Sequence, residues 1–173
     1  SDGKGFEAQL NLTRTWKNLF FDPSITRDLF VFPIEHVSGK LPSVQENKSQ
    51  ANRLDAVVIN TNDPDGFISL YQDKFGIRLA LDKVIEEWKT RILFFRINKT
   101  TIEVIEKQSE EKKAKDSLWG LSWNVENIKA AHERLTGLGV EVTDVKNGIK
   151  PDSLVCTVKS HTRGVPTLLI QHL

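Results

Sequence analysis

The sequence has no methionine, one cysteine, and no apolar run near the about 20 residues that a membrane-spanning helix requires. The single Cys156 excludes an internal disulfide, and its place in the apolar run Leu154–Val158 predicts a small core residue rather than a nucleophile. An excess of one charge is also lacking, because 24 Lys and Arg residues balance 23 Asp and Glu residues. We therefore expect a cytoplasmic protein with neither nucleic acid nor membrane as a partner.

The absence of methionine extends to position 1, and the chain opens with Ser-Asp-Gly-Lys-Gly. This is not a native translation start, and cleavage, truncation or modified methionines would each explain it. A block near this end also returns at the other end: residues 24–36 and 160–172 both read Ser-x-Thr-Arg, followed seven residues later by Ile-x-His. The spacing suits duplication of a small domain, so we expect residues 1–37 to be the C-terminal remnant of a domain without its front.

Secondary-structure signals begin before residue 38. Leu19–Phe21 and Leu29–Ile34 are β-rich runs separated by Asp22-Pro23-Ser24, and they predict two strands joined by a turn. Residues 38–53 are polar and contain Gly and Pro, which predicts a linker between domains.

Residues 54–106 predict the order strand, helix and three strands. Asp63 suits the N-cap of the helix, Pro64 suits its first position, and Gly76 ends it. The dipeptide Asn98-Lys99 predicts a hairpin between the last two strands. The expected strands are Leu54–Ile59, Ile77–Leu81, Arg91–Ile97 and Thr100–Glu106.

The same order returns after a charged Glu- and Lys-rich connector at residues 107–116. Asn127 caps the expected helix, whose inner face is Ile128, Ala131, Leu135 and Leu138, and Gly139 stops it. The expected strands are Leu118–Val125, Val140–Val145, Leu154–Val158 and Pro166–Gln171. Neither unit could bury both faces of its sheet alone, so residues 54–173 predict an α+β domain of two βαβββ units, 54–106 and 117–173.

Several short segments support a family for this arrangement. They are Leu54-Asp55-Ala56-Val57-Val58-Ile59, Asn62-Asp63-Pro64, Leu70-Tyr71, Phe75-Gly76-Ile77, Asp116-Ser117-Leu118-Trp119-Gly120-Leu121 and Gly164-Val165-Pro166-Thr167-Leu168-Leu169-Ile170. Their order and spacing resemble the vicinal oxygen chelate superfamily, which includes glyoxalase I, extradiol ring-cleaving dioxygenases and bleomycin-resistance proteins. The resemblance covers residues 54–173 and implies paired sheets that enclose a ligand cavity.

In the catalytic branches of that superfamily, a divalent metal is held by His, Glu or Gln from the first and last strands of the units. The four corresponding places in this chain are Ala56, Glu103, Gly120 (or Trp119 if the register slips by one) and Leu168. Of these four places, only Glu103 has a side chain of the type that binds the metal, whereas a useful metal site needs three or more such ligands. We therefore predict no metal and no cofactor in residues 54–173, and a divalent metal only in the missing first domain.

The resemblance and period-two alternation together give an inward-facing set of side chains. It comprises Ala56, Val58, Asn60, Thr101, Glu103, Ile105, Leu118, Gly120, Ser122, Asn124, Leu168, Ile170 and His172. Glu103 is the candidate catalytic residue, because burial among apolar groups would raise its pKa and make it a general base. An ion pair of Glu103 with Arg91 or Arg96, or simple exposure, is the alternative. The candidate ligand-binding residues are Asn60, Trp88, Arg91, Ser122 and His172.

Three functional hypotheses follow. The first is a metal-free, small-molecule-binding domain with a degenerate metal site. The second is a metal-dependent lyase of glyoxalase type, or an oxidoreductase of extradiol dioxygenase type, whose active site lies in the missing first domain. The third is an interaction module, since a domain without its front would leave strand edges exposed; a homodimer, or an extension of the neighbouring sheet, is expected in that case.

Overall fold

The computed structural model describes residues 1–8, 11–39, 47–107 and 115–173. The chain divides into two compact units, Ser1–Gln45 and Glu46–Leu173. Within the described residues, no helix is long and apolar enough to cross a membrane.

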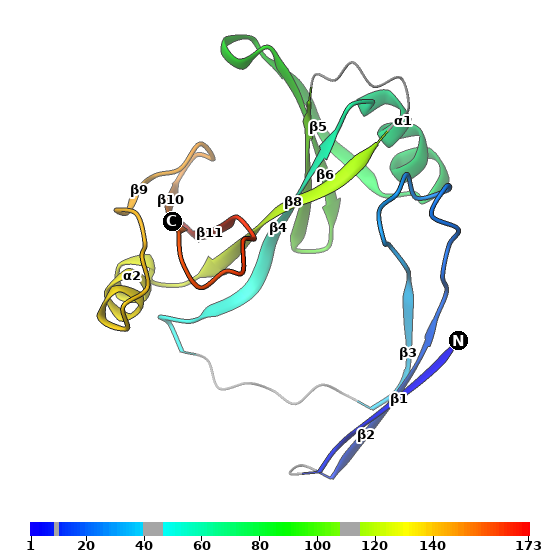
Figure 1. Cartoon of the computed structure of the whole chain (residues 1–173), viewed down its shortest axis with the longest axis horizontal. Coiled ribbons are helices and arrows are strands. Elements are labelled where there is room, and N and C mark those ends of the chain that lie inside the picture. The colour runs from blue at the N-terminus through cyan, green and yellow to red at the C-terminus, as the bar shows by residue number, and fades with distance from the viewer. Residues whose placement is uncertain (9–10, 40–46, 108–114) are drawn as a thin grey trace. The chain divides into compact units, whose positions relative to one another are not determined.

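The larger unit is built on one eight-stranded sheet with the order β5-β6-β7-β4-β8-β11-β10-β9 (Figure 1). The elements of its first half are β4 (Ala51–Thr61), α1 (Pro64–Ile68), the π-helical turn η1 (Ser69–Lys74), β5 (Arg78–Ile85), the 3-10 turn η2 (Glu86–Trp88), β6 (Thr90–Ile97) and β7 (Thr100–Glu106). Those of its second half are β8 (Asp116–Val125), α2 (Ile128–Gly137), β9 (Lys146–Asn147), β10 (Ser153–Val158) and β11 (Thr167–His172).

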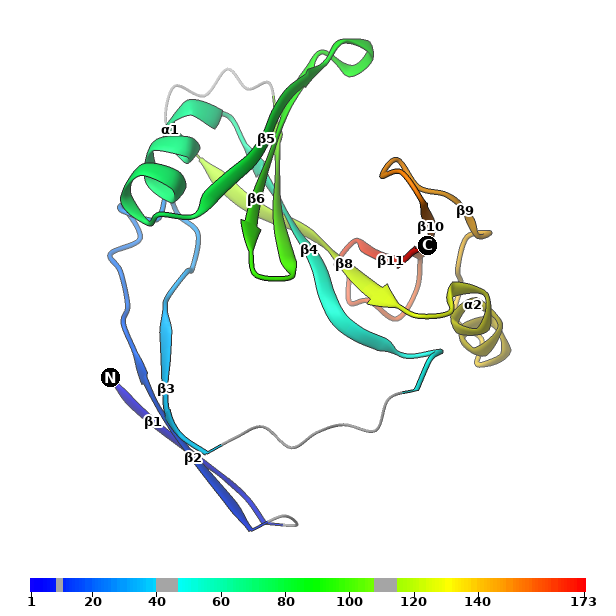
Figure 2. The same cartoon turned by 180° about the vertical axis from the view of Figure 1, so that it is seen from behind.

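The two halves repeat one topology. In each half the first strand pairs in parallel with the last, β4 with β7 and β8 with β11. The first strands, β4 and β8, pair with each other in antiparallel fashion at the centre of the sheet. Figure 2 shows α1 and α2 towards opposite ends of this sheet. The predicted tandem βαβββ fold is therefore confirmed.

Local sequence signals set both helix starts. The Asp63 carboxylate accepts a hydrogen bond from the Gly66 amide at 3.0 Å, and the Asn127 side chain accepts one from the Ala130 amide at 3.0 Å. Both contacts satisfy amides that have no partner within the first turn of a helix. Pro64 occupies the first helical position, as predicted.

Three predicted elements of the larger unit differ from the structure. Leu138 is 70% exposed, because α2 ends at Gly137 and the chain then leaves the helical direction. Residues 140–145 form no regular strand; a single bridge joins Val142 to Val158. The strands extend into the predicted linker 38–53, since β4 already begins at Ala51. Within the predicted connector 107–116, residues 108–114 lie outside the described part of the chain.

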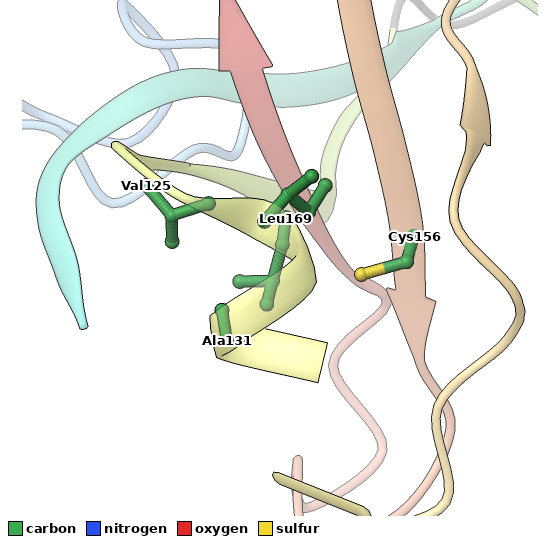
Figure 3. Packing of buried hydrophobic residues seen from close by; sticks show 5 residues of the cluster. Val125, Ala131, Cys156 and Leu169 are labelled. Atoms are coloured by element: carbon green, nitrogen blue, oxygen red, sulfur yellow. The ribbon is translucent and has the colours of Figure 1, made fainter. Parts of the chain in front are cut away.

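A hydrophobic core joins α2 to the sheet. Val125, Ile128, Ala131, Cys156 and Leu169 are buried together in this cluster, and Figure 3 shows the Cys156 sulfur pointing towards Leu169. Cys156 is therefore a core residue, as predicted. Burial in apolar surroundings raises the pKa of its thiol to about 11, which disfavours the reactive thiolate.

The smaller unit contains an antiparallel three-stranded sheet. Its strands are β1 (Asp2–Glu7), β2 (Leu12–Asn18) and β3 (Ile34–Ser38), in the order β1-β2-β3. The predicted strands Leu19–Phe21 and Leu29–Ile34 are wrong, because residues 19–33 form turns and irregular backbone. The aromatic rings that suggested strands instead pack on one another: the centroid of Phe32 lies 4.9 Å from that of Phe20 and 5.3 Å from that of Phe30.

The repeated segments share a local turn. In both, an amide donates to the carbonyl three residues earlier at 3.1 Å, Leu29 to Thr26 and Val165 to Thr162. In both, two successive residues also have positive φ: 58° and 67° at Arg27–Asp28, and 54° and 82° at Arg163–Gly164. The two segments therefore share the turn at Thr-Arg, although His161 has a positive φ of 65° and the equivalent Ile25 does not.

Candidate functional site

The two faces of the large sheet differ in what covers them. On one face, Phe95 of β6 packs on Phe67 of α1, with ring centroids 5.4 Å apart, and Leu169 of β11 packs in the α2 cluster. Because strand side chains alternate between faces, the neighbours of these two residues point the other way. We call that other side the helix-free face.

Strand register identifies the residues of the helix-free face. Val58 lies opposite Glu103 on β7 and opposite Gly120 on β8, while Ser122 lies opposite Leu168 on β11. The strands thus arrange the predicted inward-facing residues in adjacent rows, including Ala56, Asn60, Thr101, Asn124, Ile170 and His172. Ala56, Val58 and Ile170 are all buried, so much of the face is apolar.

A charged cluster interrupts this apolar face. The Asp55 carboxylate accepts from His172 Nε2 at 2.8 Å and from Lys150 Nζ at 3.0 Å, and Arg53 Nη1 lies 3.3 Å from it. Asp55 itself is only 3% exposed. The four residues come from β4, the β9–β10 loop and β11. One buried carboxylate therefore holds together three segments that are distant in sequence.

A β-bulge brings Asp55 into this cluster. The register between β4 and β8 passes from Leu54 opposite Trp123 to Ala56 opposite Ser122, so one extra residue of β4 has no partner on β8. Such an extra residue re-aims its side chain and bends its strand. Plain alternation from Ala56 would have pointed Asp55 towards the helices, which is why sequence reasoning missed it.

Electrostatics keep the Asp55 carboxylate ionised. Burial alone would raise its pKa, but the hydrogen bonds from His172 and Lys150, together with their charges, outweigh burial and hold the pKa below the ordinary value of 3.8. A buried anion with several cationic donors is stable, whereas one without them would be protonated.

Glu103 lies near this cluster on β7. Burial raises the pKa of its carboxyl above the ordinary value of 4.5; the charge of Lys150 lowers it by less, and the negative charge of Asp55 adds to the rise. Neither Arg91 nor Arg96 forms an ion pair with it: Arg96 Nη1 donates to Thr101 Oγ1 at 2.7 Å. Among the described residues, no hydrogen bond or ion pair engages the Glu103 carboxylate, which therefore has free acceptor capacity.

Two further predicted residues share the face with Glu103. The Oδ1 atom of Asn60 is buried and has no hydrogen-bond partner within the described residues. Ser122 is 7% exposed and lies between Ala56 and Leu168. An unpartnered buried carbonyl oxygen is unfavourable unless a ligand or water satisfies it.

The remaining predicted site residues lie elsewhere. Arg91 donates to Asp82 at 2.7 Å and to Asp65 of α1 at 2.7 Å, so it lies on the helix-covered side of the sheet, away from Glu103. Multiple hydrogen bonds to these two carboxylates raise the pKa of Arg91 further above its usual range. The Trp88 side chain lies outside the described part of the structure.

The places that hold a metal in the superfamily do not fit one here. Only Glu103 offers a donor atom, and a Cβ built on Gly120 would lie 2.8 Å from the Pro166 carbonyl oxygen, so an imidazole has no room there. Within the described residues, no group of three or more His, Cys, Asp or Glu side chains is arranged to hold a metal ion. The absence of a metal remains a prediction, which a titration can test.

Comparison with known proteins agrees with this fold. Residues 53–157 match the Glyoxalase/Bleomycin resistance protein/Dioxygenase superfamily, and the chain therefore belongs to that superfamily. No curated protein matches the sequence significantly.

Several solved structures have the same architecture as this chain but share little sequence identity with it. Methylmalonyl-CoA epimerase from Mycobacterium tuberculosis is 19% identical with a TM-score of 0.60, over 75% of this chain and 93% of that chain. A hypothetical protein from Bacillus halodurans C-125 is 19% identical with a TM-score of 0.59, over 72% and 96%. Streptomyces coelicolor methylmalonyl-CoA epimerase, in complex with 2-nitronate-propionyl-CoA, is 19% identical with a TM-score of 0.58, over 71% and 99%. At these identities the likeness shows the fold alone.

Lys150 is the second functional candidate that the sequence did not reveal. It lies in the loop between β9 and β10, where its carbonyl accepts from Ser153 Oγ at 2.6 Å. Its contact with Asp55 spans 95 residues of sequence. No local motif marks a loop lysine for such a contact, so only the assembled sheet identifies it.

Proposed function

We propose that the helix-free face of the larger unit binds a small organic molecule without a bound metal ion, and that Glu103 exchanges a proton with it. The observation that carries this proposal is the charged cluster of Asp55, Lys150, His172 and Arg53, with the Glu103 carboxyl near it, on a partly apolar face. Few charged groups within an apolar surface are typical of ligand sites, where they orient the bound molecule.

Each part of the cluster supports a separate task. The Lys150 side chain is 34% exposed, so its ammonium can contact an anionic or carbonyl oxygen while it also binds Asp55. Because burial raises the pKa of Glu103, its carboxylate is a better proton acceptor than that of an exposed glutamate. The partly buried apolar residues Ile105 and Leu168 of the same face offer contact surface for a carbon skeleton.

The structural neighbours suggest one ligand class among several. Two of them are methylmalonyl-CoA epimerases, and one of these is solved with 2-nitronate-propionyl-CoA. Acyl thioesters are therefore reasonable first ligands for this chain. Because one fold supports unrelated chemistries, the test needs a broader set.

The experiment is a two-dimensional NMR titration of the ¹⁵N-labelled protein with a library of small carbonyl and carboxylate compounds that includes propionyl-CoA. We expect binders to shift the amides of Asn60, Glu103, Ser122 and Leu168, and the K150M variant to bind them more weakly. The K146M variant is the matched control, because Lys146 lies exposed on the same β-hairpin. A library without binders, or shifts confined to α1 and α2, would overturn the proposal.

A further inference from the structure

We propose that Asp55 and His172 form an acid–base pair, in which Asp55 positions the imidazole and Nδ1 of His172 accepts a proton from the bound molecule. This inference rests on the proposed function for its ligand. It adds a second proton-transfer group to Glu103 and assigns Asp55 the role of a positioning residue. The juxtaposition that carries it is the 2.8 Å contact between His172 Nε2 and a carboxylate that is 3% exposed.

The contact determines which imidazole nitrogen carries the proton. An ionised carboxylate only accepts hydrogen bonds, so at 2.8 Å from Asp55 Oδ1 the Nε2 atom of His172 must be the donor. In the neutral ring, the other nitrogen, Nδ1, then has a free lone pair. Within the described residues, no hydrogen bond engages Nδ1. The His172 side chain is 39% exposed, so a ligand can approach it.

The surroundings hold this arrangement in place. Lys150 and Arg53 also contact the Asp55 carboxylate, and among the described residues they are, with His172, the cations that face it. The strand end that carries His172 is fixed along β10: His172 pairs with Ser153, and the Leu173 amide donates to the Asp152 carbonyl at 2.8 Å. A fixed imidazole loses less entropy in a reaction than a mobile one.

The nearby charges point to enolisation of a carbonyl compound that carries an anionic group. In the forward step, Nδ1 of His172 takes a proton from the carbon next to the carbonyl. The C–H electron pair forms the C=C bond of an enolate, and the carbonyl electron pair moves to oxygen, where the Lys150 ammonium offsets the charge. Reprotonation of the carbon by the imidazolium reverses the step. No oxidant, reductant or co-reactant is required.

The first arm of the test needs no ligand. Long-range ¹H–¹⁵N NMR of the imidazoles reports which nitrogen is protonated. We expect His172 to be the Nε2–H tautomer in the wild type and to lose that preference in D55N. His132 and His161, which do not contact Asp55, serve as internal references. A His172 ring protonated on Nδ1, or a tautomer that D55N leaves unchanged, would overturn the inference.

The second arm measures proton transfer. The probe is 2-oxobutanoate in D₂O, and ¹H NMR follows the loss of its C3 proton signal. We expect the wild type to exchange the C3 protons faster than buffer alone. The H172A variant should lose about 100-fold of that acceleration, and free imidazole added to H172A should restore part of it. Restoration by imidazole would not occur if His172 only supported the fold. H161A and D152N are matched controls and should retain the wild-type rate.

The outcomes of this arm separate the inference from the proposed function. Suppose that 2-oxobutanoate shifts the amides of the helix-free face. If the protein then does not accelerate the exchange of the C3 protons, or if H172A accelerates it as much as the wild type, the acid–base pair is refuted and the binding site stands. If neither 2-oxobutanoate nor any library compound binds, the proposed function fails as well. Should D55N unfold, D55E with its longer carboxylate replaces it, and we expect a partial loss of exchange.

Discussion

Lys150 Nζ lies 3.0 Å from Asp55 Oδ2, so the loop between β9 and β10 of the second half is tied to the first strand of the first half. Asp55 is buried by the sheet, whereas Lys150 keeps about a third of its side chain in solvent. The contact therefore links the stability of the sheet to the charge distribution on the helix-free face. Stability and ligand binding should both respond to the loss of the Asp55 charge.

Asp55→Asn is expected to destabilise the protein by about 2 kcal/mol at pH 7, because it leaves Lys150, His172 and Arg53 close together without their anion. Urea unfolding followed by circular dichroism measures the change. Asp152→Asn is the control, because Asp152 lies exposed in the same loop, and its backbone rather than its side chain holds Leu173.

The pH dependence of this loss has a defined sign. The pKa of Asp55 is lower in the folded protein than its ordinary value of 3.8, so its contribution to stability is full above that value and is lost as the pH falls through the folded pKa. The difference between wild type and D55N should shrink as the pH falls below 3.8. A difference that grows below pH 3.8 would contradict the assigned charge state.

Glu103→Gln should make the protein more stable at neutral pH. The pKa of Glu103 is raised above its ordinary value of 4.5, so its contribution to stability is full below that value and is lost as the pH rises through the folded pKa. We expect E103Q to have a higher urea midpoint than wild type at pH 8 and an equal one at pH 4. E133Q, on the exposed side of α2, should match the wild type at both values.

Gly120→Ala tests the close approach of β8 and β11. The added Cβ would lie 2.8 Å from the Pro166 carbonyl oxygen, which is backbone and cannot move alone, so we expect a loss of about 2 kcal/mol. Gly137→Ala meets no atom within 4 Å and replaces a helical glycine, so it should be neutral or stabilising. Equal thermal midpoints for G120A and G137A would show that the two strands can separate freely.

Cys156 should be nearly unreactive in the folded protein. With a thiol pKa of about 11 and no exposed surface, little thiolate is available at pH 8. Reaction with Ellman's reagent should be slow in buffer and fast in concentrated urea, with one equivalent released. Rapid native reaction would mean that the α2 core opens easily.

Much of the fold was predictable because its signals are local. The bounds of β7, Thr100–Glu106, were predicted as observed, and both helix caps formed at the predicted Asp63 and Asn127. Alternation also identified Glu103 and Ser122 as residues of one face. These predictions depend on backbone periodicity and capping, which a short segment largely determines.

The rest depended on contacts between distant segments. Asp55 enters the cluster through a bulge that is defined only by the register of β4 against β8. Lys150 reaches it from a loop that carries no motif. In the smaller unit, aromatic residues at 19–33 indicated strands by propensity, but Phe20, Phe30 and Phe32 pack on one another instead. Tertiary packing overrides β-propensity in such cases.

The most direct test of the central claim is an isothermal calorimetric titration of the untagged wild-type protein with ZnCl₂ and with NiCl₂. Since a single ligand-type residue remains at the superfamily's metal positions and Pro166 fills the space beside Gly120, the account predicts no saturable binding of either ion. Stoichiometric binding that the E103Q variant loses would contradict it.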